Sequence, residues 1–497
     1  MTQGDHLLRL KRLFLESLHL LLFTSLGFLV MGYHPGFEDD GVYLTAVKSD
    51  LNPALFPHDA AFFRLQLQAT AFDGWMAQFV RWTGISLATA ELIWQFAALF
   101  LILWATKRIS THIFDQKRSH WAAVAMVSAM FTLPVAGTAL NIADQHLHPR
   151  NLATALILMA ISRILDGKRL QAIPLLLIAF LLHPIMAALG ISFCAFLTVS
   201  MLQRVPYYLR VAEGSVSAAV PLGWILEPPS PQWREALNTR SYYFLYHWTW
   251  YEWLGALAPL LLFGLLRRFA QRRGDDRLAR FSLGVLAYGV FQQVVAMIIL
   301  GADPLVRLTP LQPMRYLQLV YVCMALVAGG LIGGLLKTSV WRWGAYLLVL
   351  NVSMFYTQRE FIDDGTHIET AASDDANPWL QAFAWIRQNT PTNAYFAVDP
   401  RYLAAPREGF HSFRALAERS RLADAIKDAA VVTQVPSLAP EWDQQVKAQA
   451  GWSDFQLADF ERLKSKFGVD WALVSYPQPH GLPCRWHNDT LSICRIP

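Results

Sequence analysis

The sequence predicts a polytopic α-helical membrane protein, with about eleven transmembrane helices followed by a C-terminal extracytoplasmic α/β domain. The first observation is composition: of 497 residues, 54% are hydrophobic and only 16% are charged, against roughly 25% charged in a soluble domain. The second is a series of apolar runs. The third is a change to alternating helix and strand patterns near residue 360.

Apolar runs of bilayer-spanning character fill most of the first 358 residues. They lie near 13–32, 85–105, 120–140, 149–165, 170–182, 185–202, 205–224, 251–267, 281–300, 314–336 and 340–357. The runs 170–182 and 205–224 are the weakest. A basic start before the first run also fits a cleaved signal peptide, but no small-residue cleavage site follows Val30, so we expect a retained anchor.

The basic residues indicate the orientation. Lys and Arg gather before the first run and after the even-numbered runs, as in RRFAQRRGDDRLAR from Arg267 to Arg280. The positive-inside rule therefore predicts a cytoplasmic N-terminus and, with an odd number of spans, an extracytoplasmic C-terminal domain. This pattern accounts for the net charge of +5. The sequence has no basic face interleaved with aromatic residues, so nucleic-acid binding is not predicted. We expect a multi-pass protein of the inner (cytoplasmic) membrane, surrounded by membrane lipids.

Two domains are predicted. Residues 1–358 form the transmembrane domain, with a long first outer loop, 33–84, whose apolar spacing predicts helices lying on the outer leaflet. Residues 359–497 form a soluble α/β domain with a largely parallel sheet. Within it, AYFAVD and VDWALVS read as strands, and NPWLQAFAWIRQNTP reads as a helix. A second helix should run from the N-cap Ser453 to Gly468.

The four cysteines fall into two classes. Cys194 and Cys323 lie in apolar runs and are expected to pack in the core, whereas Cys484 and Cys494 lie in the polar tail. The tail pair could form a disulfide if the tail is outside the cytoplasm. The tail has no Gly-rich phosphate loop, so no nucleotide is assigned to it.

The first outer loop opens with FEDDGVYL, which places Glu38, Asp39 and Asp40 directly after the first span. Such a cluster repels itself unless a cation, a hydrogen-bond donor or a reaction requires it. A plainer reading is that the three acids are solvated residues at the start of a helix beginning at Gly41, whose positive end suits carboxylates. Other outer loops add imidazole and guanidinium groups: His146, His148, Arg150, His183, Arg240, Arg307 and Arg315.

The histidines of HLHPR have open interpretations. Their spacing suits an extended pair of metal ligands such as those of zinc, but lone loop histidines are commoner. His146 and His148 are also candidates for contact with a substrate. His183, just before Pro184, reads most simply as a polar group at the end of a span.

EDDGVY at the start of a long outer loop, short hydrophobic spans and an outer α/β domain together resemble the GT-C superfamily of integral-membrane glycosyltransferases. The tail stretches WIRQNTP, GFHSFRALAERS and FGVDWALVS are similar to tails of uncharacterised bacterial members. The resemblance covers the whole architecture, and EDDGVY is its one local motif. It implies a polyprenyl-phosphate-linked sugar donor and a glycan or lipid acceptor.

That resemblance suggests roles for the outer residues. In an inverting displacement a carboxylate takes the acceptor proton while a cation stabilises the departing phosphate. Asp39 or Asp40 is the expected base, and Glu38 supports it or holds a divalent cation such as Mg²⁺ or Mn²⁺, with all three acids as possible ligands. Arg315 is the preferred phosphate partner, because guanidinium contacts phosphate in bidentate fashion. The alternatives are Arg307, Arg150 and Arg240.

Two other classes of function remain open. A secondary transporter would carry ionisable residues near the middle of its spans, but here Glu91, near the outer end of a span, is the main charge inside one. The second alternative is a non-catalytic envelope protein that binds a glycan or a partner. The sequence does not exclude it.

Overall fold

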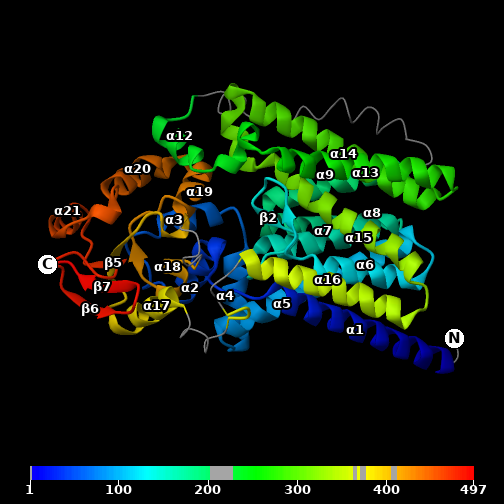
Figure 1. Cartoon of the computed structure of the whole chain (residues 1–497), viewed down its shortest axis with the longest axis horizontal. Coiled ribbons are helices and arrows are strands. Elements are labelled where there is room, and N and C mark those ends of the chain that lie inside the picture. Colours follow the sequence, from blue (N-terminus) through cyan, green and yellow to red (C-terminus); the bar gives the residue numbers. More distant parts are fainter. Residues whose placement is uncertain (1–2, 202–227, 362–365, 370–376, 405–410) are drawn as a thin grey trace.

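The computed structural model describes residues 3–201, 228–361, 366–369, 377–404 and 411–497. These residues form a mostly helical molecule, with a bundle of long helices at one end and a small sheet domain at the other (Figure 1). The N-terminus lies at the far end of the bundle, and the C-terminus lies in the sheet domain. The predicted combination of a helical bundle with a C-terminal sheet domain is confirmed.

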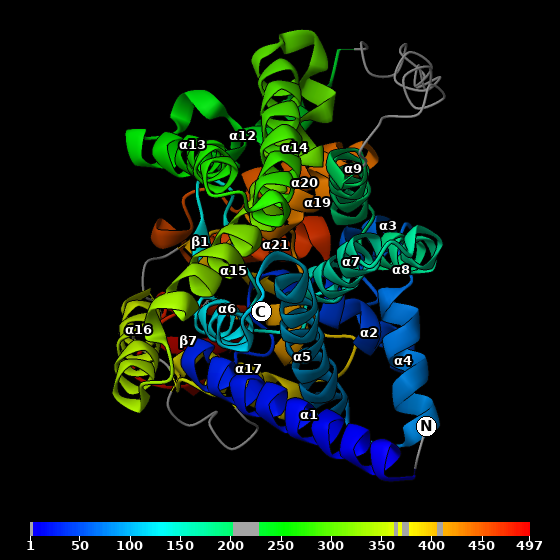
Figure 2. The ribbon, with the colours of Figure 1, turned by 90° about the vertical axis from the view of Figure 1, so that its right-hand side faces the viewer.

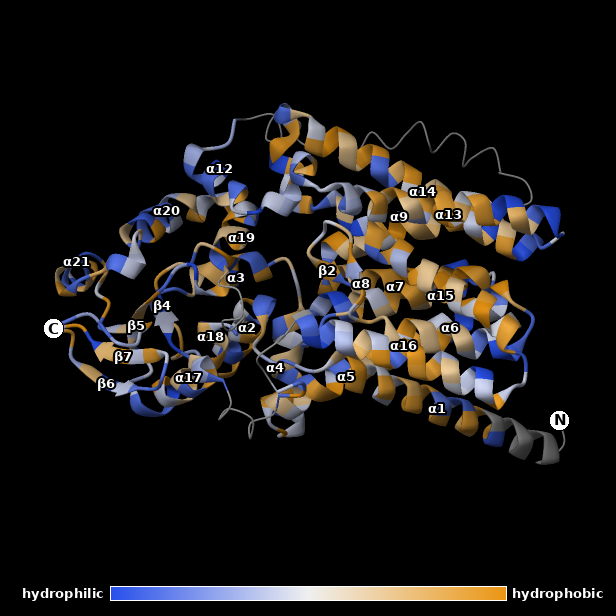
Figure 3. Ribbon diagram, viewed as in Figure 1, coloured by the Kyte–Doolittle hydropathy of each residue, from blue (hydrophilic) through white to orange (hydrophobic). Residues whose placement is uncertain are grey.

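The bundle helices follow the apolar runs, and hydrophobic residues colour most of their length (Figure 3). They are α1 (Gln3–Met31), α5 (Leu87–Ile113), α6 (Lys117–Ala129), α7 (Pro149–Leu165), α8 (Arg169–Leu182), α9 (Pro184–Met201), α13 (Trp250–Arg272), α14 (Asp276–Gly301), α15 (Leu317–Leu336) and α16 (Val340–Phe361). Seen along the bundle, α5, α6 and α15 lie between α1 and α9, which are at its periphery (Figure 2). The predicted span 205–224 falls outside the described residues.

Six helices in the described ranges are long and apolar enough to cross a membrane by length and composition. They cover Leu13–Met31, Leu87–Ile113, Pro184–Met201, Trp250–Arg272, Asp276–Gly301 and Pro313–Leu336. Many of their large apolar side chains, such as Leu261 and Met297, are exposed on the molecule. Exposed apolar surface on long helices is what a lipid environment requires, so the chain is a multi-pass membrane protein.

The expected span over 120–140 is wrong in its second half. After α6 the chain forms a short antiparallel hairpin of β1 (Pro134–Val135) and β2 (Leu140–Asn141). Gly137 makes the turn possible, since its φ is 62° and a Cβ there would lie 2.4 Å from the ring of Trp248. α6 ends at Ala129, and Pro134 together with the positive φ of Gly137 is incompatible with a helix that continues to residue 140.

The first outer loop is helical, as predicted, but it also packs on the tail. Its elements are η1 (Glu38–Gly41), α2 (Tyr43–Leu51), α3 (Ala61–Leu67) and α4 (Phe72–Thr83). Its buried residues share one hydrophobic core with α12 (Pro231–Asn238), α19 (Lys427–Gln434) and α20 (Ala439–Ala448). Phe62, Trp233 and Trp442 are examples from the three regions. This common core holds the loop and the tail together, and the two are called the cap below.

The chain on either side of α13 and α14 also contains short 3-10 turns. These are η2 (Ser241–Tyr243), η3 (Leu245–His247), η4 (Asp303–Leu311) and η5 (Pro313–Tyr316). η5 runs directly into α15, so its residues lie at the start of a candidate span.

The tail is built on a five-stranded sheet with the order β4-β3-β5-β7-β6. The strands are β3 (Tyr395–Val398), β4 (Ser420–Arg421), β5 (Trp471–Ser475), β6 (Cys484–His487) and β7 (Leu491–Arg495). β3 pairs in parallel with β4 and β5, whereas β7 pairs antiparallel with β5 and β6. The expectation of a largely parallel sheet is wrong for the C-terminal strands, because the short β6–β7 connection permits only an antiparallel hairpin.

Helices surround the sheet. They include α17 (Pro378–Asn389), α18 (Phe413–Ala417) and α21 (Leu457–Phe467). Ser453 is not the N-cap of α21, since it lies in η8 (Trp452–Asp454). Gln456 and Asp459 form the capping box instead. The helix ends at Gly468, as predicted, with a φ of 77°.

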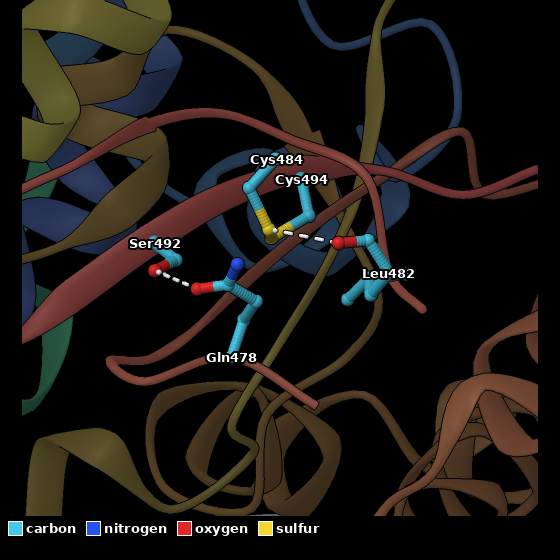
Figure 4. The surroundings of a disulfide bond; sticks show 5 residues. All are labelled: Gln478, Leu482, Cys484, Ser492 and Cys494. Atoms are coloured by element: carbon cyan, nitrogen blue, oxygen red, sulfur yellow. Dashed lines mark hydrogen bonds between the residues drawn. A yellow bond between two sulfur atoms is a disulfide. The ribbon is translucent and has the colours of Figure 1, made fainter. Parts of the chain in front are cut away.

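Cys484 and Cys494 form a disulfide between β6 and β7 (Figure 4). The two residues are opposite each other in the strand register, with Cα atoms 3.7 Å apart. Nearby, the Ser492 hydroxyl donates to the Gln478 side-chain oxygen at 3.3 Å. Cys194 and Cys323 are buried and free, as expected.

Candidate active site

The acidic turn FEDDG follows α1 and divides its three acids. Glu38 has a φ of 43°, a left-handed value that residues with side chains rarely adopt. Asp40 turns inward, where its Oδ2 accepts the backbone N–H of Gly36 at 2.8 Å. Burial, followed by the charges of Glu91 and Asp39, raises the pKa of Asp40. Asp40 is buried, while the side chains of Glu38 and Asp39 remain part-exposed.

The tail domain holds this turn in place. The backbone N–H of Ser412 donates to the Gly36 carbonyl at 2.7 Å, and Phe37 pairs with His411 in an antiparallel bridge. A Cβ on Gly41 would lie 2.6 Å from the Ser412 hydroxyl oxygen. Glycine is therefore needed at this position if the turn is to approach the tail so closely.

Asp39 is held between two cationic or N–H groups from distant parts of the chain. Its Oδ1 accepts from Lys427 Nζ at 2.8 Å, and its Oδ2 lies 3.4 Å from Nε2 of His148. The same ammonium lies 3.3 Å from Glu38 Oε2. Burial alone would raise the pKa of Asp39, but Lys427, His148 and the more distant Arg150 hold it well below its usual range. Asp39 is therefore ionised at neutral pH.

His148 is the N-cap of α7, and the cap determines its tautomer. Its Nδ1 accepts the backbone N–H of Arg150 at 2.9 Å, so in the neutral ring the proton is on Nε2, which faces Asp39. Burial, followed by the nearby Arg150 charge, lowers the pKa of His148 to about 4. A neutral His148 is therefore a hydrogen-bond donor toward Asp39 at pH 7.

Arg150 is fixed by Asp144 in a bidentate pair. Its Nε lies 3.0 Å from Oδ2 and its Nη2 lies 2.6 Å from Oδ1 of that carboxylate. Arg150 is 3% exposed, and its remaining Nη1 has no hydrogen-bond partner within the described residues. A buried N–H without a partner is costly, so Arg150 has one donor available for a ligand.

Arg240 and Arg315 complete the basic side of the site. Arg240 Nη2 donates to the backbone carbonyl of Ile426, next to Lys427. Arg315 lies in η5 at the start of the span Pro313–Leu336. Its Nε is buried without a hydrogen-bond partner in the part of the chain that the structure describes.

These groups line one cavity of about 370 Å³. Its polar lining contains Glu38, Asp39, Tyr43, His148, Arg150, His183, Arg240, Tyr242, Tyr243, Gln312, Arg315 and Lys427. The cavity is bounded by the first outer loop, the ends of bundle helices next to the cap and α19 of the tail. It therefore combines two carboxylates with several guanidinium groups at the junction of the bundle and the cap.

Three of the predicted site residues do not line this cavity. Asp40 is turned away, and His146 is 5% exposed with both ring nitrogens unpartnered among the described residues. Arg307 lines a separate cavity with Trp233 and donates to the carbonyl of Pro228 at 3.3 Å.

Lys427 is the functional candidate that sequence reasoning missed. It is the first residue of α19, in the tail domain, and nothing in the surrounding DAIKDAA distinguishes it from a solvated helix residue. Only the docking of α19 on the first outer loop brings it to Asp39. His183 was expected to be a plain polar group at a span end. Its Nδ1 accepts the Met186 N–H at 3.4 Å, and the residue also lines the cavity.

The residues present do not suit a divalent cation. Among the described residues, no group of three or more His, Cys, Asp or Glu side chains is arranged to hold a metal ion. Glu38 and Asp39 share the Lys427 ammonium, and Asp40 directs its Oδ2 to a backbone N–H. His148 presents N–H rather than a lone pair to Asp39, so it is not a ligand there.

Comparisons with known proteins give one family match. A family described as a domain of unknown function (DUF6798) matches residues 377–449, which cover α17 to α20. No curated protein matches the chain. The family match includes Lys427 but not the acidic turn.

Solved structures with a similar arrangement are of the archaeal oligosaccharyltransferase AglB from Archaeoglobus fulgidus. The complex of AglB with an inhibitory peptide and a dolichol-phosphate is 12% identical with a TM-score of 0.44, covering 92% of this chain and 69% of that chain. The apo form is 11% identical with the same TM-score and coverage. At this level of similarity, a function for the present chain must come from its own residues.

Proposed function

We propose that the chain is a membrane glycosyltransferase that transfers a sugar from a polyprenyl-phosphate-linked donor to an envelope acceptor on the outer face. The observation that carries the proposal is that Asp39 and Arg315 line the same cavity. A carboxylate and a guanidinium whose Nε has no hydrogen-bond partner among the described residues are the groups that a displacement at a sugar phosphate needs.

The reaction uses these groups as follows. The acceptor hydroxyl gives its proton to the Asp39 carboxylate as its oxygen forms a bond to the anomeric carbon. The bond between that carbon and the phosphate oxygen breaks, and the phosphate keeps the electron pair. The side chain of Arg315 stabilises the new phosphate charge, with Arg150 and Arg240 beside it. His148 orients Asp39 through its Nε2 proton.

The position of the cavity relative to the spans suits a lipid-linked donor. The acidic turn follows the span Leu13–Met31, and Arg315 begins the span Pro313–Leu336. Both therefore lie where a span reaches the water boundary. A polyprenyl phosphate holds its phosphate at that level while the chain stays in the hydrocarbon.

An outer location of the cap is supported by two observations. The tail carries the Cys484–Cys494 disulfide, a bond that persists in oxidising compartments and is rare in the cytosol. The basic block Arg267–Arg280 lies at the α13–α14 connection, which is at the opposite end of the bundle from the sheet domain (Figure 1). Both observations are consistent with an inner-membrane protein whose N-terminus is cytoplasmic and whose cap is extracytoplasmic.

A non-catalytic glycan-binding protein is the second candidate, and one observation favours it. Asp39 is paired with Lys427 at 2.8 Å, and a carboxylate whose pKa is held low is a weak base. A sugar could then bind to the cavity by hydrogen bonds without reacting.

An assay of sugar transfer from a radiolabelled lipid-linked donor distinguishes the transferase from the glycan-binding protein. Purified full-length chain in lipid nanodiscs is incubated with a radiolabelled polyprenyl-phosphate-sugar extract and with envelope glycan from the same cells. Loss of label from the lipid fraction, with gain in the glycan fraction, is expected for wild type and not for the Asp39→Asn, Arg315→Gln double variant. Equal label in both proteins, at equal protein levels, would exclude the proposed reaction.

A further inference from the structure

Lys427 occupies the position in which a cation would neutralise the acidic turn. Its Nζ lies 2.8 Å from Asp39 Oδ1 and 3.3 Å from Glu38 Oε2. The side chain is 12% exposed, so most of it is withdrawn from water. The Asp39 and Glu38 side chains are 34% and 47% exposed, so the pairing with Lys427 is less screened than a fully exposed ion pair but is not sealed from water.

The backbone around Lys427 is firmly anchored. The Asp424 side chain accepts the N–H groups of Ile426 and Lys427, at 2.8 and 2.5 Å, at the start of α19. Asp428, one residue further, forms a bidentate pair with Arg414 at 2.7 and 3.0 Å. The network therefore fixes the backbone from which the Lys427 side chain extends, and the two carboxylates hold the ammonium at its end.

That network also reaches the first outer loop. Arg414 Nε contacts Asp59 Oδ2 at 2.5 Å, and the same oxygen accepts the Arg421 N–H at 3.0 Å. The loop that carries Asp39 and the helix that carries Lys427 are thus joined by a second buried ionic contact. The ionic contacts of Arg414 therefore hold Lys427 close to Asp39.

The remaining groups around Asp39 are hydrogen-bond donors and positive charges, which disfavour a metal ion. Its other oxygen faces the Nε2 proton of His148 at 3.4 Å. Arg240, which also lines the cavity, donates to the carbonyl of Ile426 beside Lys427. An incoming cation would meet two positive charges and would have to displace the ammonium from both carboxylates.

We propose that Lys427 serves as the built-in cation of this site, supplying to Glu38 and Asp39 the charge that a divalent metal would otherwise supply. The tail domain thus contributes a positioning residue to the site, and its docking completes the site. The consequence for transfer, that it needs no added metal, rests on the proposed function. The occupation of the two carboxylates by the ammonium does not.

Manganese binding tests the inference without any activity assay. Full-length chain in lipid nanodiscs is titrated with Mn²⁺, and the bound ion is followed by electron paramagnetic resonance. Wild type and Asp39→Asn should bind the same small amount of Mn²⁺. Lys427→Met should bind it about tenfold more tightly or better, because one positive charge is gone from the carboxylates. Adding Asp39→Asn to Lys427→Met should abolish the gain.

Two further variants serve as controls. Lys427→Arg keeps the charge and should gain no Mn²⁺ site. Lys48→Met removes another ammonium between the first outer loop and the tail, the pair with Glu418 at 2.7 Å, which lines a different cavity. It should also gain none. Thermal unfolding of each variant shows that the protein remains folded.

Two results would overturn the inference. One is Mn²⁺ bound by wild type and lost in Asp39→Asn, which would make the acids a metal site despite Lys427. The other is a folded Lys427→Met protein that binds Mn²⁺ no better than wild type. Neither measurement involves sugar transfer. Both Mn²⁺ titrations would therefore still test the inference if the proposed reaction were wrong.

Discussion

Nε2 of His148 lies 3.4 Å from Oδ2 of Asp39, while Nδ1 of the same ring accepts the Arg150 N–H at 2.9 Å. The histidine thus caps α7 with one nitrogen and faces the acidic turn with the other. A helix end and a loop more than a hundred residues apart are linked through one ring. This link separates Asp39 from its neighbour Asp40, which has no such partner and is buried against Gly36.

The first prediction compares the two aspartates. Asp39→Asn should lower sugar transfer by about 100-fold or more, the usual loss when a general base is removed. Asp40→Asn should keep transfer close to wild type, because an amide oxygen can still accept the Gly36 N–H. Transfer rates in nanodiscs, at matched protein amounts, measure both. Equal losses in the two variants would show that the acids act as one structural unit.

Asp40→Asn carries a stability expectation as well. Burial raises the pKa of Asp40, so a proton is bound more tightly in the folded state than in the unfolded state. The stabilising effect of that proton is lost as the pH rises through the folded pKa. The variant should therefore be at least as stable as wild type at pH 8, as measured by thermal unfolding in detergent.

The second prediction concerns Arg315. Arg315→Lys keeps the charge but loses the planar fork that binds two phosphate oxygens. We expect KM for the lipid-linked donor to rise about tenfold. Arg307→Lys is the matched control, since Arg307 lies on the same outer loop but lines a separate cavity. A similar rise in both variants would indicate a general charge effect on the membrane surface.

Several features of the site followed from the sequence because they depend on where spans end. With the predicted order of spans, the acids directly after the first apolar run and the arginine at the start of the tenth fall on the same side of the bilayer. Glu38, Asp39 and Arg315 were predicted in this way and line one cavity. The helices of the first outer loop followed equally from their apolar spacing.

Other features depend on contacts that no local pattern contains. Asp39 and Asp40 are adjacent residues of the same type, so the sequence does not distinguish them. The backbone of the turn directs Asp39 into the cavity and Asp40 to the N–H of Gly36. Lys427 reaches the site because α19 packs on the first outer loop. The end of α6 at Ala129 was missed because the residues that follow are also apolar, and hydropathy does not distinguish a short hairpin from a continued helix.

The third prediction tests the orientation through the cysteines. If the tail is extracytoplasmic, Cys484 and Cys494 should be oxidised in the cell. Protein extracted in the presence of a thiol-blocking reagent should carry no label on them until it is reduced. Cys194 and Cys323 should be labelled without reduction, but only after denaturation, because both are buried. Peptide mass spectrometry reads all four positions. Label on unreduced Cys484 would place the tail in a reducing compartment.

The last prediction concerns Glu369, which joins the chain after α16 to the acidic turn. Its two oxygens lie 3.2 Å from His34 Nδ1 and 2.7 Å from His411 Nε2. Its backbone N–H donates to the Tyr33 carbonyl at 2.8 Å. Since His411 also pairs with Phe37, the contact braces both sides of the turn.

Burial alone would raise the pKa of Glu369, but the hydrogen bonds of His34 and His411 lower it from 4.5 to about 2. The folded state therefore favours the ionised form, and the resulting stability is present above about pH 4.5 and lost as the pH falls toward about 2. Glu369→Gln should lower the free energy of unfolding by up to about 3 kcal/mol at pH 7. At pH 3 the deficit should be less than about half as large.

Thermal unfolding of wild type and Glu369→Gln in the same detergent, from pH 7 down to pH 3, checks this dependence. The matched control is Glu418→Gln, which removes a carboxylate paired with Lys48 at 2.7 Å but 25% exposed, so its effect should be within about 1 kcal/mol. A Glu369→Gln deficit that stays constant over the whole range would mean that the side chain contributes packing alone. A deficit that shrinks with falling pH identifies the carboxylate charge as the group that braces the acidic turn.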